Sequence, residues 1–132
     1  MKTICIIGAG PSGLFCAHKI LSEYGSKASK EDFRIVIIEK GEKPSARSCP
    51  GAVDGVCRKC DSCAILSGGG GAGLFSDGKI IQDLNVGGHN DTVFALSAEE
   101  KDEYISYITQ TLVSFDGVST YKEKPCEEIQ EN

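Results

Sequence analysis

At 132 residues, the chain is long enough for one compact domain and too short for two of ordinary size. Its residues are 40% hydrophobic and 25% charged, proportions typical of a soluble globular protein and not of a disordered one. The net charge of −5 argues against nucleic acid and an anionic membrane surface as partners, because binding phosphates needs clustered Lys and Arg. No segment approaches the ~20 apolar residues of a membrane-spanning helix, so we expect no membrane association and a cytoplasmic location.

The first forty residues have the pattern of a strand, a helix and a second strand. Residues 3–8 are almost continuously apolar, which is typical of a central strand in a parallel sheet covered by helices on both faces. Pro11 suits a first helical turn, and apolar residues then recur at helical spacing over 12–24. The members of this stripe are Leu14, Ala17, Ile20, Leu21 and Tyr24. Residues 33–38 form a second apolar strand that ends at Glu39, so we predict an α/β fold with a right-handed parallel crossover.

The rest of the chain is less regular. Residues 40–92 hold most of the glycines and show no clear period, and such a long irregular stretch is usually functional. Ser97-Ala-Glu-Glu100 is a capping box, which predicts a helix to about residue 114. Its expected inner face consists of Tyr104, Ile105, Ile108 and Leu112. Residues 118–121 suit a short strand, and 122–132 suit a polar tail.

A glycine motif joins the first predicted strand to the first predicted helix. Gly8, Gly10 and Gly13 form G-x-G-x-x-G, with an acid at the end of the next strand. In dinucleotide-binding units the first glycine allows a tight turn, the second lets the backbone approach a pyrophosphate, and the third lets the helix lie close to the sheet. The amides of the first helical turn then face the phosphates. These features predict a Rossmann-like βαβ dinucleotide-binding unit.

This unit also predicts which residues hold the ADP half of the ligand. They are Gly8, Gly10, Pro11, Ser12, Gly13, Glu39 and Lys40. Glu39 would accept hydrogen bonds from the adenosine ribose, and its charge would repel the extra phosphate of NADP. NAD and FAD both use such a loop, so the motif by itself leaves the two cofactors open. A glycine-rich turn that binds nothing is the third alternative.

A second group of motifs lies further along the chain. It comprises Cys49-Pro50, Cys57-Arg-Lys-Cys60-Asp-Ser-Cys63 and Ser67-Gly-Gly-Gly-Gly-Ala-Gly-Leu-Phe-Ser-Asp-Gly-Lys79. Together these motifs resemble a family of FAD-dependent dehydrogenases, usually labelled uncharacterised NAD(FAD)-utilising dehydrogenases. The stretch 70–79 is the most specific part of the match. The resemblance covers roughly residues 1–120.

The resemblance implies FAD as the cofactor and the two-dinucleotide-binding-domain flavoprotein fold. Residues 1–121 would then be a partial FAD domain, in which 40–92 form a Gly/Cys-rich region on the cofactor side. The loop 69–79 would run along the pyrophosphate towards the flavin. It would add Gly70, Gly71, Gly73, Ser76, Asp77, Gly78 and Lys79 to the cofactor site. Taken alone, the run of glycines would equally suit a flexible linker.

Members of this family are several times longer than this chain. The resemblance therefore implies an N-terminal piece of an FAD-dependent oxidoreductase, whose full-length form could take electrons from NAD(P)H. We expect the chain alone to bind FAD weakly or not at all and not to turn over, and we identify no catalytic residue. The alternatives are a non-catalytic nucleotide-binding remnant, a subunit completed by another chain, and an NAD-binding Rossmann module.

Four cysteines form a separate cluster in the sequence. Cys49, Cys57, Cys60 and Cys63 have the spacing C-x7-C-x2-C-x2-C, which resembles ligand runs of iron–sulfur clusters and zinc sites. C-x-x-C is also the spacing of redox dithiols, and a third interpretation is that these cysteines are structural or vestigial. We list these four cysteines as candidate ligands of an iron–sulfur cluster or zinc.

Overall fold

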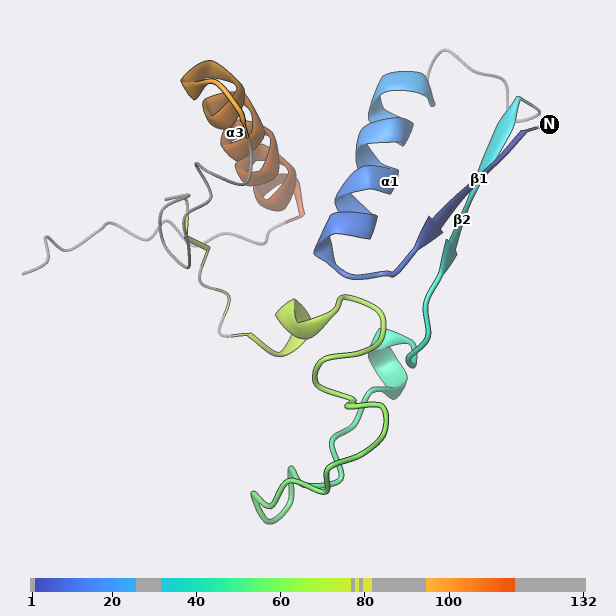
Figure 1. Ribbon diagram of the computed structural model, residues 1–132, viewed down its shortest axis with the longest axis vertical. Coiled ribbons are helices and arrows are strands. Elements are labelled where there is room, and N and C mark those ends of the chain that lie inside the picture. Colours follow the sequence, from blue (N-terminus) through green and yellow to red (C-terminus); the bar gives the residue numbers. More distant parts are fainter. Residues whose placement is uncertain (1, 26–31, 77, 79, 82–94, 116–132) are drawn as a thin grey trace, which may run out of the picture. The chain divides into compact units, whose positions relative to one another are not determined.

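Two parallel strands and one helix form the centre of the first part of the chain (Figure 1). The computed structural model describes residues 2–25, 32–76, 78, 80–81 and 95–115. It divides the chain into two units, Met1–Asp77 and Gly78–Asn132. The first unit contains β1 (Lys2–Ile7), α1 (Pro11–Tyr24), β2 (Phe33–Ile38) and the short 3₁₀ helices η1 (Pro44–Ala46) and η2 (Ala72–Phe75), and the second contains α3 (Ala98–Ser114).

β1 and β2 pair in parallel, in a register that runs from Lys2 opposite Phe33 to Ile7 opposite Ile38. The connection between them contains α1, so the predicted βαβ unit is confirmed with element boundaries within one residue of those expected. Parallel strands require such a crossover, because a short hairpin cannot bring two strands into the same direction.

Among the described residues of the first unit, α1 covers one face of this two-stranded sheet. Side chains alternate along each strand, and those facing α1, such as Ile6 and Ile37, are half-buried. The opposite face carries the exposed side chains of Cys5, Ile7, Val36 and Ile38, and Ile7 is 87% exposed. The structure places α1 on one face of the sheet, and the expectation of a helix on the other face stays a prediction.

Helix α1 contacts the sheet through its smallest residues. Ala17 is buried, with 8% of its surface exposed, and Gly13 and Ile20 are half-buried. The rest of the predicted stripe is exposed: Leu14, Leu21 and Tyr24. The periodicity identified the helix correctly, but it overestimated the buried face, because a single two-stranded sheet covers less of the helix surface than a complete domain core.

In the second unit, α3 begins with the predicted capping box. The Ser97 hydroxyl accepts a hydrogen bond from the Glu100 amide at 3.2 Å, and the Glu100 carboxylate accepts one from the Ser97 amide at 2.8 Å. None of the helix residues is buried, and Tyr104 on the predicted inner face is 51% exposed. The predicted strand at 118–121 and the tail at 122–132 lie outside the described residues.

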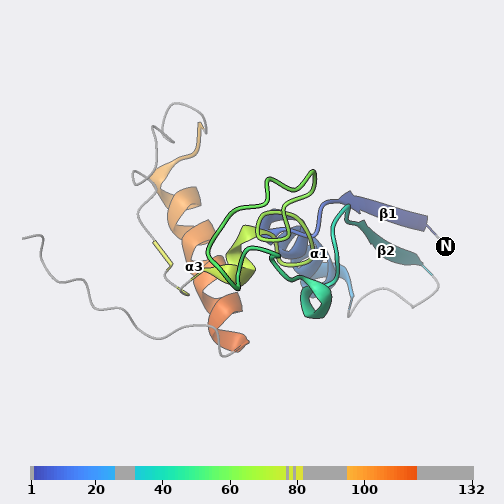
Figure 2. The same cartoon turned by 90° about the horizontal axis from the view of Figure 1, so that it is seen from below.

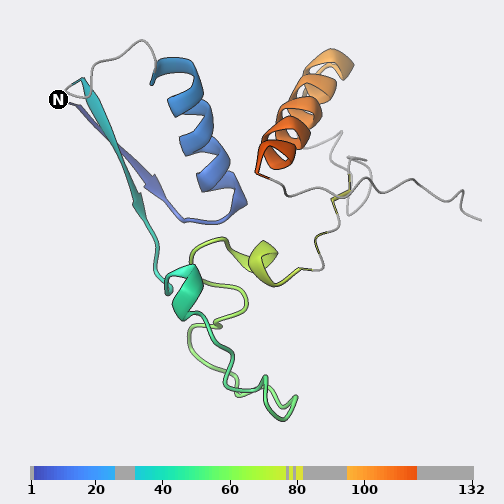
Figure 3. The same ribbon diagram turned by 180° about the vertical axis from the view of Figure 1, so that it is seen from behind.

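Residues 39–76 connect these elements without a strand, as expected for an irregular region. The backbone first turns through η1, then makes an out-and-back excursion over roughly 48–63, and returns through a glycine loop to η2 (Figures 2 and 3). Within the described part of the chain, no helix combines the length and the apolar character needed to cross a bilayer.

Replacing Gly13 by Ala should destabilise the protein. A Cβ at this position would collide with the Gly8 carbonyl oxygen and lie 3.3 Å from Cγ2 of Ile6, so α1 would have to move away from β1. Overpacking of this kind costs about 1–3 kcal/mol of unfolding free energy, measurable by urea denaturation of the full chain. Gly10→Ala is the matched control, since its Cβ would meet nothing within 4 Å; equal losses in the two variants would contradict the close packing.

Candidate functional site

The turn between β1 and α1 has the geometry that the glycine motif predicts. Gly8 has φ of +99°, a conformation that L side chains rarely adopt, and its amide donates to the Ile38 carbonyl at 2.7 Å. Gly10 caps α1 in extended conformation, and Pro11 occupies the first turn. Gly13 lies where any side chain would strike the Gly8 carbonyl. The first turn of α1 is thus held close against the carboxyl end of β1.

The Glu39 carboxylate joins three separate parts of the chain. Its Oε2 accepts a hydrogen bond from the Ala9 amide at 2.7 Å, and its Oε1 accepts from the Gly41 amide at 3.0 Å and the Gly68 amide at 3.1 Å. These backbone hydrogen bonds, with the one from Ala9 the strongest and Gly41 next, lower the pKa of Glu39 below its usual value. The group therefore stays ionised down to lower pH than an ordinary glutamate.

The sequence predicts that Glu39 binds a ribose, and in the structure this side chain also binds the protein's own backbone. A carboxylate offers about four acceptor positions, and the three amides occupy three of them. Oε2 accepts the Ala9 amide, and a ribose hydroxyl would share this carboxylate with the backbone amides. The backbone contacts also fix the direction in which that oxygen points.

The glycine loop packs directly on the dinucleotide turn. The Gly70 amide donates to the Ala9 carbonyl at 2.8 Å. Gly71 has φ of +61°, and a Cβ there would lie 3.0 Å from Cδ of Pro11 and 3.1 Å from Cα of Gly10. A glycine is therefore needed at Gly71 both for its backbone angle and for the close approach. The structure brings together two glycine motifs that are separated by about sixty residues in the sequence.

The side chain of Arg47 binds the backbone of this loop and of the residues before it. The side chain is 7% exposed, and its guanidinium donates to four carbonyls: Nε to Ala64 at 2.9 Å, Nη2 to Ile65 at 2.7 Å, and Nη1 to Gly69 and Gly71 at 2.7 Å each. Its Cζ also lies 4.8 Å from the centre of the Phe75 ring, in the range of a cation–π contact. One buried side chain thus fixes the path of the chain from 64 to 75.

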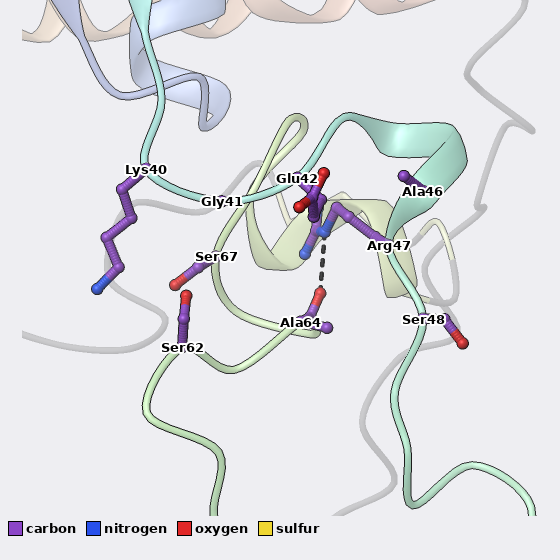
Figure 4. A pocket seen from close by; sticks show the side chains of 9 residues that line it. All are labelled: Lys40, Gly41, Glu42, Ala46, Arg47, Ser48, Ser62, Ala64 and Ser67. Carbon is purple, nitrogen blue, oxygen red and sulfur yellow. Dashed lines mark hydrogen bonds between the residues drawn. The ribbon is translucent and has the colours of Figure 1, made fainter.

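A pocket of about 300 Å³ opens beside Arg47 (Figure 4). Its lining is as much apolar as polar and consists of Lys40, Gly41, Glu42, Ala46, Arg47, Ser48, Ser62, Ala64 and Ser67. Figure 4 shows the side chains of Lys40, Ser62 and Ser67 on one side of this lining. Gly41 and Ser67 border the amides that bind Glu39, so the pocket adjoins the predicted ribose position.

Comparison with known protein families identifies this assembly. The model of the NAD(P)-binding Rossmann-like domain matches residues 6–71, which is half of the 132-residue chain. The chain belongs to this family. The matched range begins within β1 and ends in the glycine loop, so the NAD(P)-binding Rossmann-like region includes the first glycine motif, Glu39, Arg47 and the start of the glycine loop.

A curated protein is similar to a short part of the chain. Over 50 residues the chain is 44% identical to the probable electron transfer flavoprotein-ubiquinone oxidoreductase, mitochondrial, of Schizosaccharomyces pombe. The aligned stretch is 38% of this chain and 8% of that protein, so the chain spans a small part of its relative's length. No solved structure matches the chain.

Most of the predicted cofactor residues gather at one place in this Rossmann-like unit. Those at the turn and under the loop are Gly8, Gly10, Pro11, Gly13, Glu39, Gly70, Gly71 and Gly73. Ser12, Lys40 and Ser76 are exposed in the same unit. Gly78 is exposed and belongs to the second unit, while Asp77 and Lys79 lie outside the described residues.

The four clustered cysteines lie on the excursion and its two ends. All are free thiols; Cys57 and Cys60 are exposed, and Cys49 and Cys63 are half-buried. The Lys59 amide donates to Sγ of Cys57 at 3.5 Å. Among the described residues, no three His, Cys, Asp or Glu side chains are grouped so that they could hold a metal ion. The structure thus does not assemble the four-cysteine site, and the iron–sulfur or zinc hypothesis stays a prediction.

Arg47 is the site residue that sequence reasoning missed. Its signal was weak, because a single Arg in an irregular region more often lies in solvent than in a core. The sequence around it does contain the structural cause: a stretch rich in glycine exposes many backbone carbonyls, which need donors once they are buried.

The hydrogen bonds of Glu39 should make stability depend on pH. A carboxylate with a lowered pKa stabilises the folded state above its unfolded pKa, and this contribution is lost as pH falls through the lower folded value. Wild type should therefore unfold at higher urea than Glu39→Gln at about pH 7, and the difference should shrink at about pH 3. The exposed Asp61→Asn variant is the control, and a difference for Glu39→Gln that stays constant with pH would contradict the assignment.

Proposed function

We propose that this chain holds the ADP half of FAD and is the dinucleotide-binding part of an FAD-dependent oxidoreductase. The observation that carries the proposal is the contact between the two glycine motifs, through the Gly70 amide and the Ala9 carbonyl. A minimal strand–helix–strand unit offers one glycine turn to a diphosphate. Here a second loop lies against the first and borders the same ligand position.

Different residues would bind the diphosphate and the ribose of the ligand. The open space at Gly10 leaves room for the diphosphate beside the backbone, and the amides at the start of α1 provide donors at the positive end of the helix dipole. Glu39 would bind the ribose through its carboxylate, which the ribose would share with the backbone amides. FAD itself would supply the redox chemistry, and the chain would contribute binding and orientation.

Two observations support FAD over the pyridine nucleotides. The relative that shares 44% identity over 50 residues is described as a flavoprotein oxidoreductase. The loop 68–73 extends the cradle beyond the turn shared by all dinucleotide-binding units. NADP is disfavoured because the ionised Glu39 would repel its additional phosphate.

The second candidate function is a nucleotide-binding subunit whose catalytic part is on another chain. The uncovered apolar face of the sheet favours it, since Cys5, Ile7, Val36 and Ile38 would be buried in a domain with more layers. Under either proposal the chain alone does not turn over, and it binds FAD more weakly than a complete enzyme would.

Calorimetric titration of the full chain distinguishes the cofactors. We expect FAD and ADP to bind, NAD to bind about tenfold more weakly than FAD, and NADP to bind more weakly than NAD. Gly10→Ala should weaken FAD and ADP at least about tenfold while leaving the unfolding midpoint unchanged, because its Cβ enters ligand space and contacts no protein atom within 4 Å.

Two outcomes would count against this function, and a third would contradict only the expected weakness of FAD binding. NAD binding as tightly as FAD would favour an NAD module, and binding of none of the four ligands would overturn the dinucleotide proposal. A full-occupancy flavin spectrum in the purified chain would contradict the expectation that the chain binds FAD weakly.

A further inference from the structure

We propose that Arg47 is a positioning residue for the diphosphate of the ligand. The inference rests on the proposed function, and it assigns to a buried guanidinium the task of holding the glycine loop in its binding conformation. The residue does not need to touch the ligand. It acts through the backbone that it binds.

The hydrogen bonds of Arg47 reach both sides of the loop. Nη1 binds the carbonyls of Gly69 and Gly71, so it spans the residue whose amide donates to Ala9. On the other side of the loop, the Gly68 amide binds Glu39, and the Gly69 amide donates to the Glu42 carbonyl at 2.9 Å. The loop is therefore fixed by carbonyls that point to Arg47 and amides that point to the turn and to the segment after β2.

Orientation of the peptide groups is the consequence that matters for a ligand. When a carbonyl points to Arg47, the amide of the next residue points the other way, because the two groups lie in one planar peptide unit. Arg47 thereby sets the direction of two amides: that of Gly70, which donates to the Ala9 carbonyl and holds the loop on the turn, and that of Ala72, which faces away from Arg47. The Ala72 amide would then be the loop donor that a diphosphate meets beside the turn.

The positive charge of Arg47 is not paired with a carboxylate. Within the described ranges, the ion pairs join Lys19 with Glu23 and Arg58 with Asp54, and none includes Arg47. Four carbonyls accept hydrogen bonds from the guanidinium, and the Phe75 ring lies against it. These partners are uncharged, so they do not neutralise the positive charge of Arg47. A buried unpaired cation beneath the loop favours an anionic ligand above it.

Lysine cannot replace this arrangement. A guanidinium presents five N–H donors in a rigid planar fork, whereas an ammonium has three donors at one point. Arg47→Lys would keep the charge and lose most of the four carbonyl contacts. The conservative variant therefore separates the positioning role from simple charge.

The test compares ADP with adenosine, which lacks the diphosphate. We expect Arg47→Lys to weaken ADP binding by the full chain at least about tenfold, while adenosine binding changes less than about threefold. Arg34→Lys is the matched control, because Arg34 is exposed and binds the Thr3 hydroxyl away from the loop. Unchanged ADP binding, or equal losses for ADP and adenosine, would overturn the proposal.

A second variant and a second measurement test the role of Arg47 independently of the Arg47→Lys binding data. Gly71→Ala, which leaves Arg47 intact and displaces the loop from Pro11, should reproduce the selective loss of ADP binding; unchanged ADP binding would count against the proposal. Amide hydrogen exchange of residues 64–71 should quicken in Arg47→Lys while exchange in α1 stays the same. If wild type binds neither ADP nor adenosine, the proposed function fails. Hydrogen exchange then tests the role of Arg47 by itself, and unchanged exchange rates at residues 64–71 in Arg47→Lys would overturn that role.

Discussion

The carboxylate of Glu39 accepts hydrogen bonds from amides of three segments and so joins them at one point. Ala9 belongs to the turn after β1, Gly41 follows β2, and Gly68 begins the glycine loop. Each of these amides would lack a partner if the acid were lost, and an unsatisfied polar group costs more than a hydrogen bond gains. The position of the loop on the turn thus depends on an ionised side chain at the end of β2.

Arg47 acts on the same loop with the opposite charge. Glu39 binds an amide at the start of the loop, and Arg47 binds the carbonyls of Gly69 and Gly71 within the loop and two carbonyls that precede it. A segment with so few side chains cannot be held by apolar packing, because glycine buries little surface. Charged side chains that bind the backbone replace that packing. This explains why an irregular region next to a small sheet has a defined path.

Sequence reasoning predicted the elements that depend on local patterns. The apolar runs gave β1 and β2, the glycine spacing gave the turn, and Ser97 with Glu100 gave the start of α3. It could not predict how much of α1 is buried, because that depends on how many strands lie beneath the helix. It also assigned Glu39 to a ligand alone, since two of the three amides that this residue binds, those of Ala9 and Gly68, come from segments 30 and 29 residues away. Non-local contacts of this kind leave no periodic signal.

The most direct test of the account is a titration of isotopically labelled protein with FAD, followed through the backbone amide signals. If the chain holds the ADP half of FAD as described, the largest shifts fall on amides at the start of α1 and in the loop 68–73, and ADP reproduces them. Shifts confined to α3, or the absence of any shift in the turn and loop, would contradict the account.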